Sequence, residues 1–185
     1  MTFEECLEST TRTLQALTEI RPAIDAAAVM ILNTLRSGGK ILTAGNGGSA
    51  AEASHFATEL TGRYAKNRRG LPAIALSADG SLVTCIANDY GYEAAFSRSL
   101  SALGRPGDLF IAFTSSGNSP NVLAALKTAR DLRLGTVAFL GRGGGTTRGV
   151  ADVELIVPGL RGAAAQEAHL FLIHYFCELI DTEFA

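Results

Sequence analysis

The stretch KILTAGNGGSAAEASHFATEL, residues 40–60, indicates the fold of this chain. A short apolar strand ends in a glycine-rich turn, and a helix is predicted from about Ala50 to Leu60. Further apolar runs of strand length stand at 73–76, 108–114, 136–140 and 153–157, with helical stretches such as 121–133 between them. Apolar strands that alternate with helices are typical of a parallel sheet that is covered on both faces. We therefore predict an α/β fold with a doubly wound parallel sheet.

Helices are predicted at both ends of the chain. Thr2 and Glu5 have the spacing of a capping box, and Pro22 suits the first turn of a second helix that should end at residues 38–39. Residues 163–184 should form a long final helix. These helices carry more apolar surface than one sheet needs, so we expect some of them to pack between the subunits of a homo-oligomer.

Length and composition exclude several classes of protein. The chain of 185 residues is 47% hydrophobic, which suits a single domain over residues 1–185. Lys and Arg number 16 against 18 for Asp and Glu, so no overall charge attracts nucleic acid or an anionic membrane. Cys6, Cys85 and Cys177 are widely separated, which argues against a disulfide framework. With neither a signal-like start nor about 18 consecutive apolar residues, we expect a soluble cytoplasmic protein.

Two strand ends have similar sequences, LTAGNGGS at 42–49 and AFTSSGNS at 112–119. Ligands of open parallel sheets bind beyond the carboxyl ends of the strands, where helix N-termini present backbone N–H groups. Each loop alone is equally compatible with turn and helix-cap chemistry. Neither is a P-loop or a dinucleotide fingerprint. Because both stand at strand ends of one sheet, we predict a phosphate-binding site, with hydroxyl donors from Thr114, Ser115, Ser116 and Ser119.

Candidate acid–base residues lie on two helices. His55 and Glu59 are four residues apart and share one helix face, where they could hold a metal, move a substrate proton or simply hydrogen-bond. On the final helix, Gln166 and His174 are about 80° apart and can reach one pocket, whereas His169 and His174 are about 140° apart. We therefore expect only one of these two histidines to serve the site.

The segments GNGGSAAEASHFATELTGRY, IANDYGYE, TSSGNSPNV and QEAHLFLIHYF resemble the phosphoheptose isomerases, also called sedoheptulose 7-phosphate isomerases, of the sugar isomerase (SIS) fold. The order and spacing of the motifs are similar from about residue 32 to residue 180. The resemblance implies an SIS-type fold, a homotetramer, and conversion of sedoheptulose 7-phosphate to D-glycero-D-manno-heptose 7-phosphate, the first step toward nucleotide-activated heptose. Ala163 stands where many members carry an acidic residue.

The resemblance also implies roles for individual residues. Glu59 and His174 match the catalytic base and its acid partner, as enediol chemistry requires. The ligands of a zinc ion match His55, Glu59, Gln166 and His174. Substrate-contacting positions match Asn46, Gly47, Gly48, Asn88, Asp89, Thr114, Ser115, Ser116, Ser119 and Gln166. Arg63, one turn past Glu59, could neutralise the phosphate or pair with that carboxylate; the alternative is a solvated arginine beside Lys66, Arg68 and Arg69.

Three other functions are compatible with the same fold. A similar non-enzymatic branch binds the bacterial replication initiator protein, but it lacks the catalytic glutamate and the second histidine, and both Glu59 and His174 are present here. Sugar-phosphate sensors of this fold carry a DNA-binding domain, for which 185 residues leave no room. An isomerase of another ketose phosphate is the third alternative.

Overall fold

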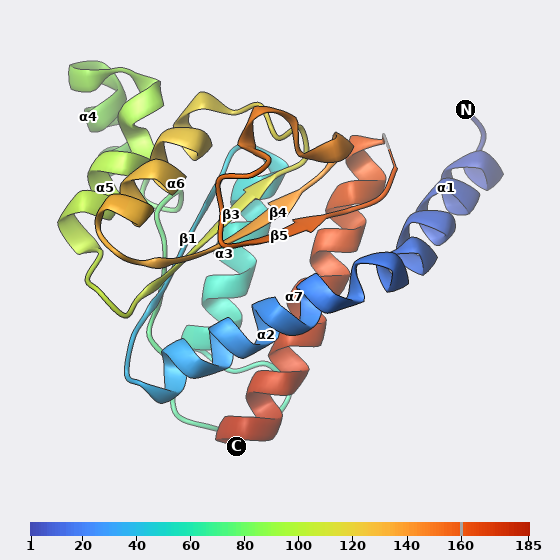
Figure 1. Ribbon diagram of the computed structural model, residues 1–185, viewed down its shortest axis with the longest axis horizontal. Helices are drawn as coiled ribbons and strands as arrows, with labels where there is room; N and C mark the ends of the chain where they lie inside the picture. The colour runs from blue at the N-terminus through green and yellow to red at the C-terminus, as the bar shows by residue number, and fades with distance from the viewer. Residues whose placement is uncertain (160) are drawn as a thin grey trace.

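Five parallel strands form one sheet in the computed structural model, in the order β2-β1-β3-β4-β5; Figure 1 labels β1, β3, β4 and β5. The structure describes residues 1–159 and 161–185. The strands are β1 (Ile41–Gly45), β2 (Ala73–Ala75), β3 (Leu109–Thr114), β4 (Gly135–Leu140) and β5 (Val153–Ile156). All four strand pairings are parallel, with Leu42 opposite Phe110 and Phe113 opposite Phe139. The predicted doubly wound parallel sheet is confirmed.

The helices precede, connect and follow these strands. The α-helices are α1 (Phe3–Ala16), α2 (Arg21–Arg36), α3 (Gly48–Thr61), α4 (Gly80–Tyr90), α5 (Ala95–Leu103), α6 (Pro120–Asp131) and α7 (Gly162–Phe184). Short 3-10 helices are η1 (Leu17–Ile20), η2 (Tyr92–Ala94) and η3 (Arg142–Thr147). The predicted capping box starts α1, where Thr2 and Glu5 each accept a hydrogen bond from the other's backbone N–H. None of the helices in the described residues combines the length and apolarity needed to span a membrane.

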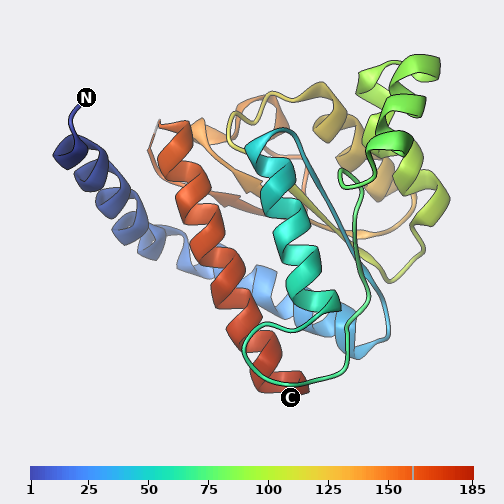
Figure 2. The same cartoon turned by 180° about the vertical axis from the view of Figure 1, so that it is seen from behind.

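The helices cover the two faces of the sheet unequally. Successive side chains of a strand point to opposite faces, so Phe113 packs with α2, α3 and α7, whereas Phe110 and Ala112 pack with α5 and α6. On the first face, α3 and α7 lie side by side (Figure 2).

All three cysteines are free, as predicted, and burial raises the pKa of Cys177, on α7, to about 12.

The chain changes direction between β1 and β3. These strands are neighbours, but the helix after β1, α3, covers one face of the sheet and the helix after β3, α6, covers the other. Their connecting loops therefore diverge at the carboxyl edge and leave a crevice between them, which is where open α/β sheets bind ligands. The two similar loops of the sequence lie on either side of this crevice.

Candidate active site

A pair of side-chain amides joins the two loops. Asn46 follows β1, and its Nδ2 donates to Oδ1 of Asn121, in the first turn of α6, at 2.8 Å. Nδ2 of Asn121 donates back to Oδ1 of Asn46 at 2.9 Å, and the hydroxyl of Tyr92 donates to the same oxygen at 2.7 Å. A cavity of about 190 Å³ beside this pair is lined by Asn46, Tyr92, Glu93, Ser119, Pro120 and Asn121. The structure thus places Asn46 and Ser119 at one cavity.

Hydroxyl groups converge where β3 ends. Oγ1 of Thr114 lies 3.4 Å from Oγ of Ser116 and 3.4 Å from Oγ of Ser119. Ser119 is the N-cap residue of α6, yet its side chain does not cap the helix, so its hydroxyl is available to a ligand. Ser115 is half-buried in the same loop. An anion here would face hydroxyl donors and the positive end of the α6 dipole.

A second loop fixes the shape of this hydroxyl loop, residues 114–119. Gly117 has a φ of +67°, and a Cβ atom on it would lie 2.1 Å from the carbonyl oxygen of Gly144. The carbonyl of Gly117 accepts from the backbone N–H of Thr147 at 2.9 Å and from its hydroxyl at 2.7 Å. Residues 142–147 therefore contact and support the hydroxyl loop.

The acid–base candidates meet between α3 and α7. Nε2 of His55 lies 3.0 Å from Oε1 of Glu59. The ring of His55 meets the ring of His174 edge to face, with centroids 5.2 Å apart, and Tyr64 packs on His174 from a centroid distance of 5.7 Å. Burial, with a contribution from Glu178, raises the pKa of Tyr64. The structure thus brings together the His55, Glu59 and His174 side chains, hereafter the α3–α7 cluster.

Gln166 lies against the start of α3. A Cβ atom on Gly48 would lie 2.2 Å from Nε2 of Gln166, so a larger residue at position 48 would require the Gln166 side chain to move. A cavity of about 350 Å³ between the helices is lined by Gly48, Ala51, Glu52, His55, Gln166, Glu167 and Leu170. Gln166 and His55 therefore share one cavity, and Gly47, which precedes α3, is exposed beside it.

The two histidines of α7 diverge, as predicted. His169 is fully buried against Phe113 and Phe139, and its Nδ1 lies 3.5 Å from Oε2 of Glu52. His174 points instead to His55. Glu52, which the sequence analysis missed, belongs to the wall of the 350 Å³ cavity. Its spacing of three residues before His55, on the same face of the helix, was the available signal.

Three of the predicted substrate contacts lie apart from these groups. Arg63 is exposed and donates to the carbonyl of Ala65 at 3.2 Å; within residues 1–159 and 161–185 it forms no ion pair with Glu59. Asn88 and Asp89 are exposed on α4, where Nδ2 of Asn88 donates to Oδ1 of Asp89 at 2.8 Å. Their hydrogen bonds connect them neither to the hydroxyl loop nor to the α3–α7 cluster within the described chain.

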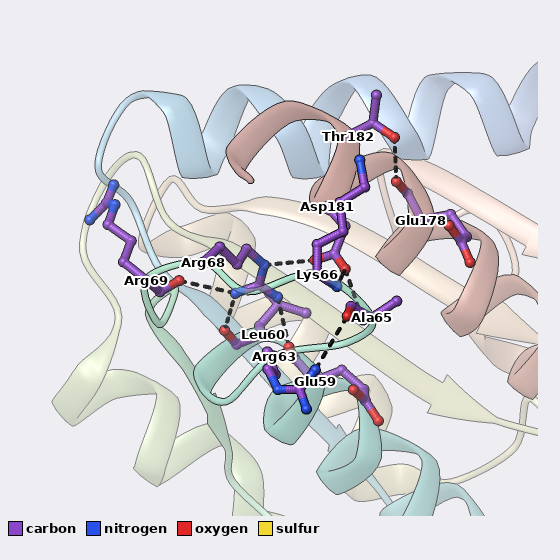
Figure 3. Close-up of polar contacts among 10 residues, drawn as sticks. All are labelled: Glu59, Leu60, Arg63, Ala65, Lys66, Arg68, Arg69, Glu178, Asp181 and Thr182. Carbon is purple, nitrogen blue, oxygen red and sulfur yellow. Dashed lines mark hydrogen bonds and ion pairs between the residues drawn. The ribbon is translucent and has the colours of Figure 1, made fainter.

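Arg63 is thus the solvated arginine of the second alternative, whereas its neighbour Arg68 is buried in an ion pair that the sequence did not predict. Its side chain is 0% exposed and that of Asp181 is 1% exposed, and Arg68 Nε lies 2.8 Å from Asp181 Oδ1 (Figure 3). Burial alone would raise the pKa of Asp181, but hydrogen bonds from the N–H of Lys66, the Arg68 guanidinium and the N–H of Ala65 lower it. The sequence signal for this buried cation was Asp181 itself, because it stands among the buried apolar residues of α7 and a buried carboxylate needs a partner.

The four predicted zinc ligands differ in how closely they approach one another. Imidazole and carboxylate groups are common zinc ligands, and His55 and Glu59 are already in contact, with His174 beside them. Across the part of the chain that the structure describes, however, no three His, Cys, Asp or Glu side chains are grouped as a metal site. The donor types therefore fit zinc, while zinc binding itself stays a prediction.

The chain is an SIS-domain protein, because the SIS domain model matches residues 6–141. A phosphoheptose isomerase of Helicobacter hepaticus is 47% identical over 91% of this chain and 86% of its own length. The structure of phosphoheptose isomerase GmhA from Neisseria gonorrhoeae is 40% identical, with a TM-score of 0.89 over 98% of this chain and all of that one. The structure of a phosphoheptose isomerase from Francisella tularensis is 36% identical, with a TM-score of 0.89 over 98% of this chain and all of that one. This chain belongs to the phosphoheptose isomerase family of SIS-domain proteins.

Proposed function

We propose that this protein is an aldose–ketose isomerase that converts sedoheptulose 7-phosphate to D-glycero-D-manno-heptose 7-phosphate, an early step in making activated heptose. The main observation behind this proposal is the packing of α3 against α7, which brings Glu59, His55 and His174 into one cluster. Family membership supports the substrate, because the similar proteins are named phosphoheptose isomerases.

Isomerisation requires a proton to leave the carbon beside a carbonyl and a proton to reach the neighbouring carbon. Glu59 is the carboxylate that can abstract the carbon-bound proton, and His55 orients it through the 3.0 Å contact. His174 is the imidazole that we assign as the acid partner of Glu59. Gln166 carries an amide, which can bind a substrate hydroxyl but cannot move a proton.

The phosphate end of the substrate is assigned to the hydroxyl loop. Thr114, Ser116 and Ser119 offer hydroxyl groups there, beside the N-terminus of α6. The reacting carbons are assigned to the α3–α7 cluster, so the two ends of the substrate are assigned to different elements of the protein.

A zinc ion is part of this proposal, with His55, Glu59, Gln166 and His174 as the residues that would hold it. When bound, zinc would polarise the substrate oxygens and stabilise negative charge on the enediol. Elemental analysis of purified wild-type protein and of His55→Ala tests the assignment, with less zinc expected in the variant. Equal zinc content in both proteins would remove His55 from the ligand set.

A panel of ketose phosphates tests the function. Purified protein is incubated with five-, six- and seven-carbon ketose phosphates, and products are assigned by NMR and mass spectrometry. We expect turnover of sedoheptulose 7-phosphate, with NMR also identifying the anomer that forms. Preferred turnover of a shorter ketose phosphate would change the substrate assignment. Binding without turnover of any sugar would instead support a non-enzymatic role for this chain.

A further inference from the structure

The buried pair of Arg68 and Asp181 connects the two helices of the α3–α7 cluster. The last carbonyls of any helix lack donors from their own helix. At the end of α3, Nη2 of Arg68 donates to the carbonyl of Glu59 at 2.8 Å and Nη1 donates to the carbonyl of Leu60 at 2.9 Å (Figure 3). The same guanidinium therefore binds the backbone of the proposed catalytic base directly.

The other end of this connection is on α7. Asp181 lies about two turns beyond His174 on that helix. One carboxylate oxygen accepts from Nε of Arg68 at 2.8 Å, and the other accepts from the N–H groups of Ala65 at 2.9 Å and Lys66 at 2.7 Å. Asp181 thus holds the segment after α3 as well as Arg68, so α7 and the end of α3 are joined at one point.

A purely structural role does not require these charges. Replacing a buried ion pair with apolar residues of similar volume is often neutral or stabilising, because desolvation offsets the attraction between the charges. The planar guanidinium has fixed donor directions, and here it binds a carboxylate on one helix and two carbonyls on the other. The pair is therefore suited to setting the relative position of α3 and α7.

We propose that Arg68 and Asp181 are positioning residues that hold Glu59 on α3 in register with His174 on α7 for proton transfer, an inference that rests on the proposed isomerase function. Neither side chain touches the cavities that would contain substrate. Their effect is expected in the rate of the chemical step, because a misplacement of about 1 Å can cost about 100-fold in rate. Binding of the phosphate by the hydroxyl loop is expected to be unaffected.

The deciding experiment compares two variants with the wild type. Arg68→Lys keeps the positive charge beside Asp181 but lacks the forked donors for the Glu59 and Leu60 carbonyls. The double variant Arg68→Met with Asp181→Leu removes both charges and approximately keeps the apolar volume. For each variant that circular dichroism shows to be folded, we expect kcat to fall by about 100-fold with an unchanged KM. With substrate deuterated at the abstracted position, the isotope effect on kcat should increase.

Asp108→Asn is the matched control, because it breaks another ion pair, to Lys40, at the amino ends of β1 and β3. It should lower the melting temperature and leave kcat unchanged. Wild-type kcat in either folded variant, or an equal loss in the control, would overturn the positioning role. An inactive wild type would overturn the proposed function and this inference together, so the two failures are distinguishable. If neither test variant folds, the pair is structural and the inference is wrong.

Discussion

At the scale of single residues, the proposed chemistry depends on Glu59 and His174. Glu59→Gln keeps the shape of the side chain but removes its basicity, and His174→Gln removes the imidazole ring. Each should lower kcat by about 10² to 10⁴, the usual cost of losing a positioned acid or base. Steady-state kinetics and a separate binding measurement with sedoheptulose 7-phosphate test this. Near-normal turnover by Glu59→Gln would exclude it as the base.

Asp181 gives a prediction for stability against pH. Its pKa is lower in the folded protein than in the unfolded chain, so its stabilising effect is complete above the unfolded value of about 4 and is lost as the pH falls through the folded value. Asp181→Asn leaves Arg68 buried without its charge partner, which should cost about 3 to 5 kcal/mol at pH 7.

Denaturant unfolding of Asp181→Asn and wild type from pH 7 to pH 3 measures this effect. The difference in unfolding free energy between the wild type and Asp181→Asn should stay constant down to pH 5. It should become smaller below about pH 4, where the Asp181 carboxyl of the wild type takes up a proton and loses its charge. A difference that is independent of pH over the whole range would show that the charge of Asp181 does not contribute.

Some of these residues could be predicted from the sequence because a helix fixes their spacing. His55 and Glu59 share a face at i and i+4, and the angle between His169 and His174 on α7 correctly separates them. Arg68 could not be assigned in this way, because its partner Asp181 is 113 positions away. Such pairs depend on how the helices pack, and no local pattern specifies that.

At the scale of elements, the hydroxyl loop is the part that should control substrate binding. Replacing Ser116 and Ser119 with Ala removes two hydroxyls that converge with Thr114. A hydrogen bond to a charged group contributes about 1.5 to 3 kcal/mol, so the KM for the sugar phosphate should rise by at least about tenfold. Inhibition by inorganic phosphate should weaken in parallel, and unchanged values for both would exclude this loop from the site.

The strands and terminal helices were predicted better than the connections. Apolar runs and caps identify β3, β4, α2 and α7 to within a few residues, because burial on both faces leaves a continuous apolar pattern. The helices α4 and α5 were not predicted, since residues 80–103 mix apolar residues with Ser, Asn and Thr. The contact of residues 142–147 with the hydroxyl loop depends on positive φ angles at glycines, which the sequence permits but does not specify.

At the scale of the whole molecule, α1 projects beyond the sheet and packs on α7 (Figure 1). Apolar side chains remain exposed in this region, with Phe3 76%, Leu7 57% and Phe171 53% exposed. An apolar groove beside them is lined by Leu14, Leu17, Thr18, Arg21, Ile24, Phe171, Leu172 and Tyr175. Exposed apolar surface of this kind commonly marks a protein–protein interface, and we propose that it is buried in the homotetramer that the family resemblance implies.

Sedimentation equilibrium at micromolar concentration should therefore give a mass four times that of one chain. Phe171→Glu should weaken the assembly by placing a charge in the apolar region, without unfolding the subunit, because the side chain is half exposed. Loss of activity in proportion to loss of tetramer would indicate that the site depends on neighbouring subunits. A fully active monomer would refute the assembly proposal.

The order of the elements, with α7 after the sheet and α3, has a consequence during protein synthesis. The sheet and α3 leave the ribosome before the helix that covers Phe113 and Phe139 on one face. Until α7 follows, that apolar face is open to chaperones and to other nascent chains, as in any partly folded domain. Translation that stops before α7 should therefore yield insoluble chains rather than a weaker enzyme, because this helix completes the core and supplies His174 in a single step.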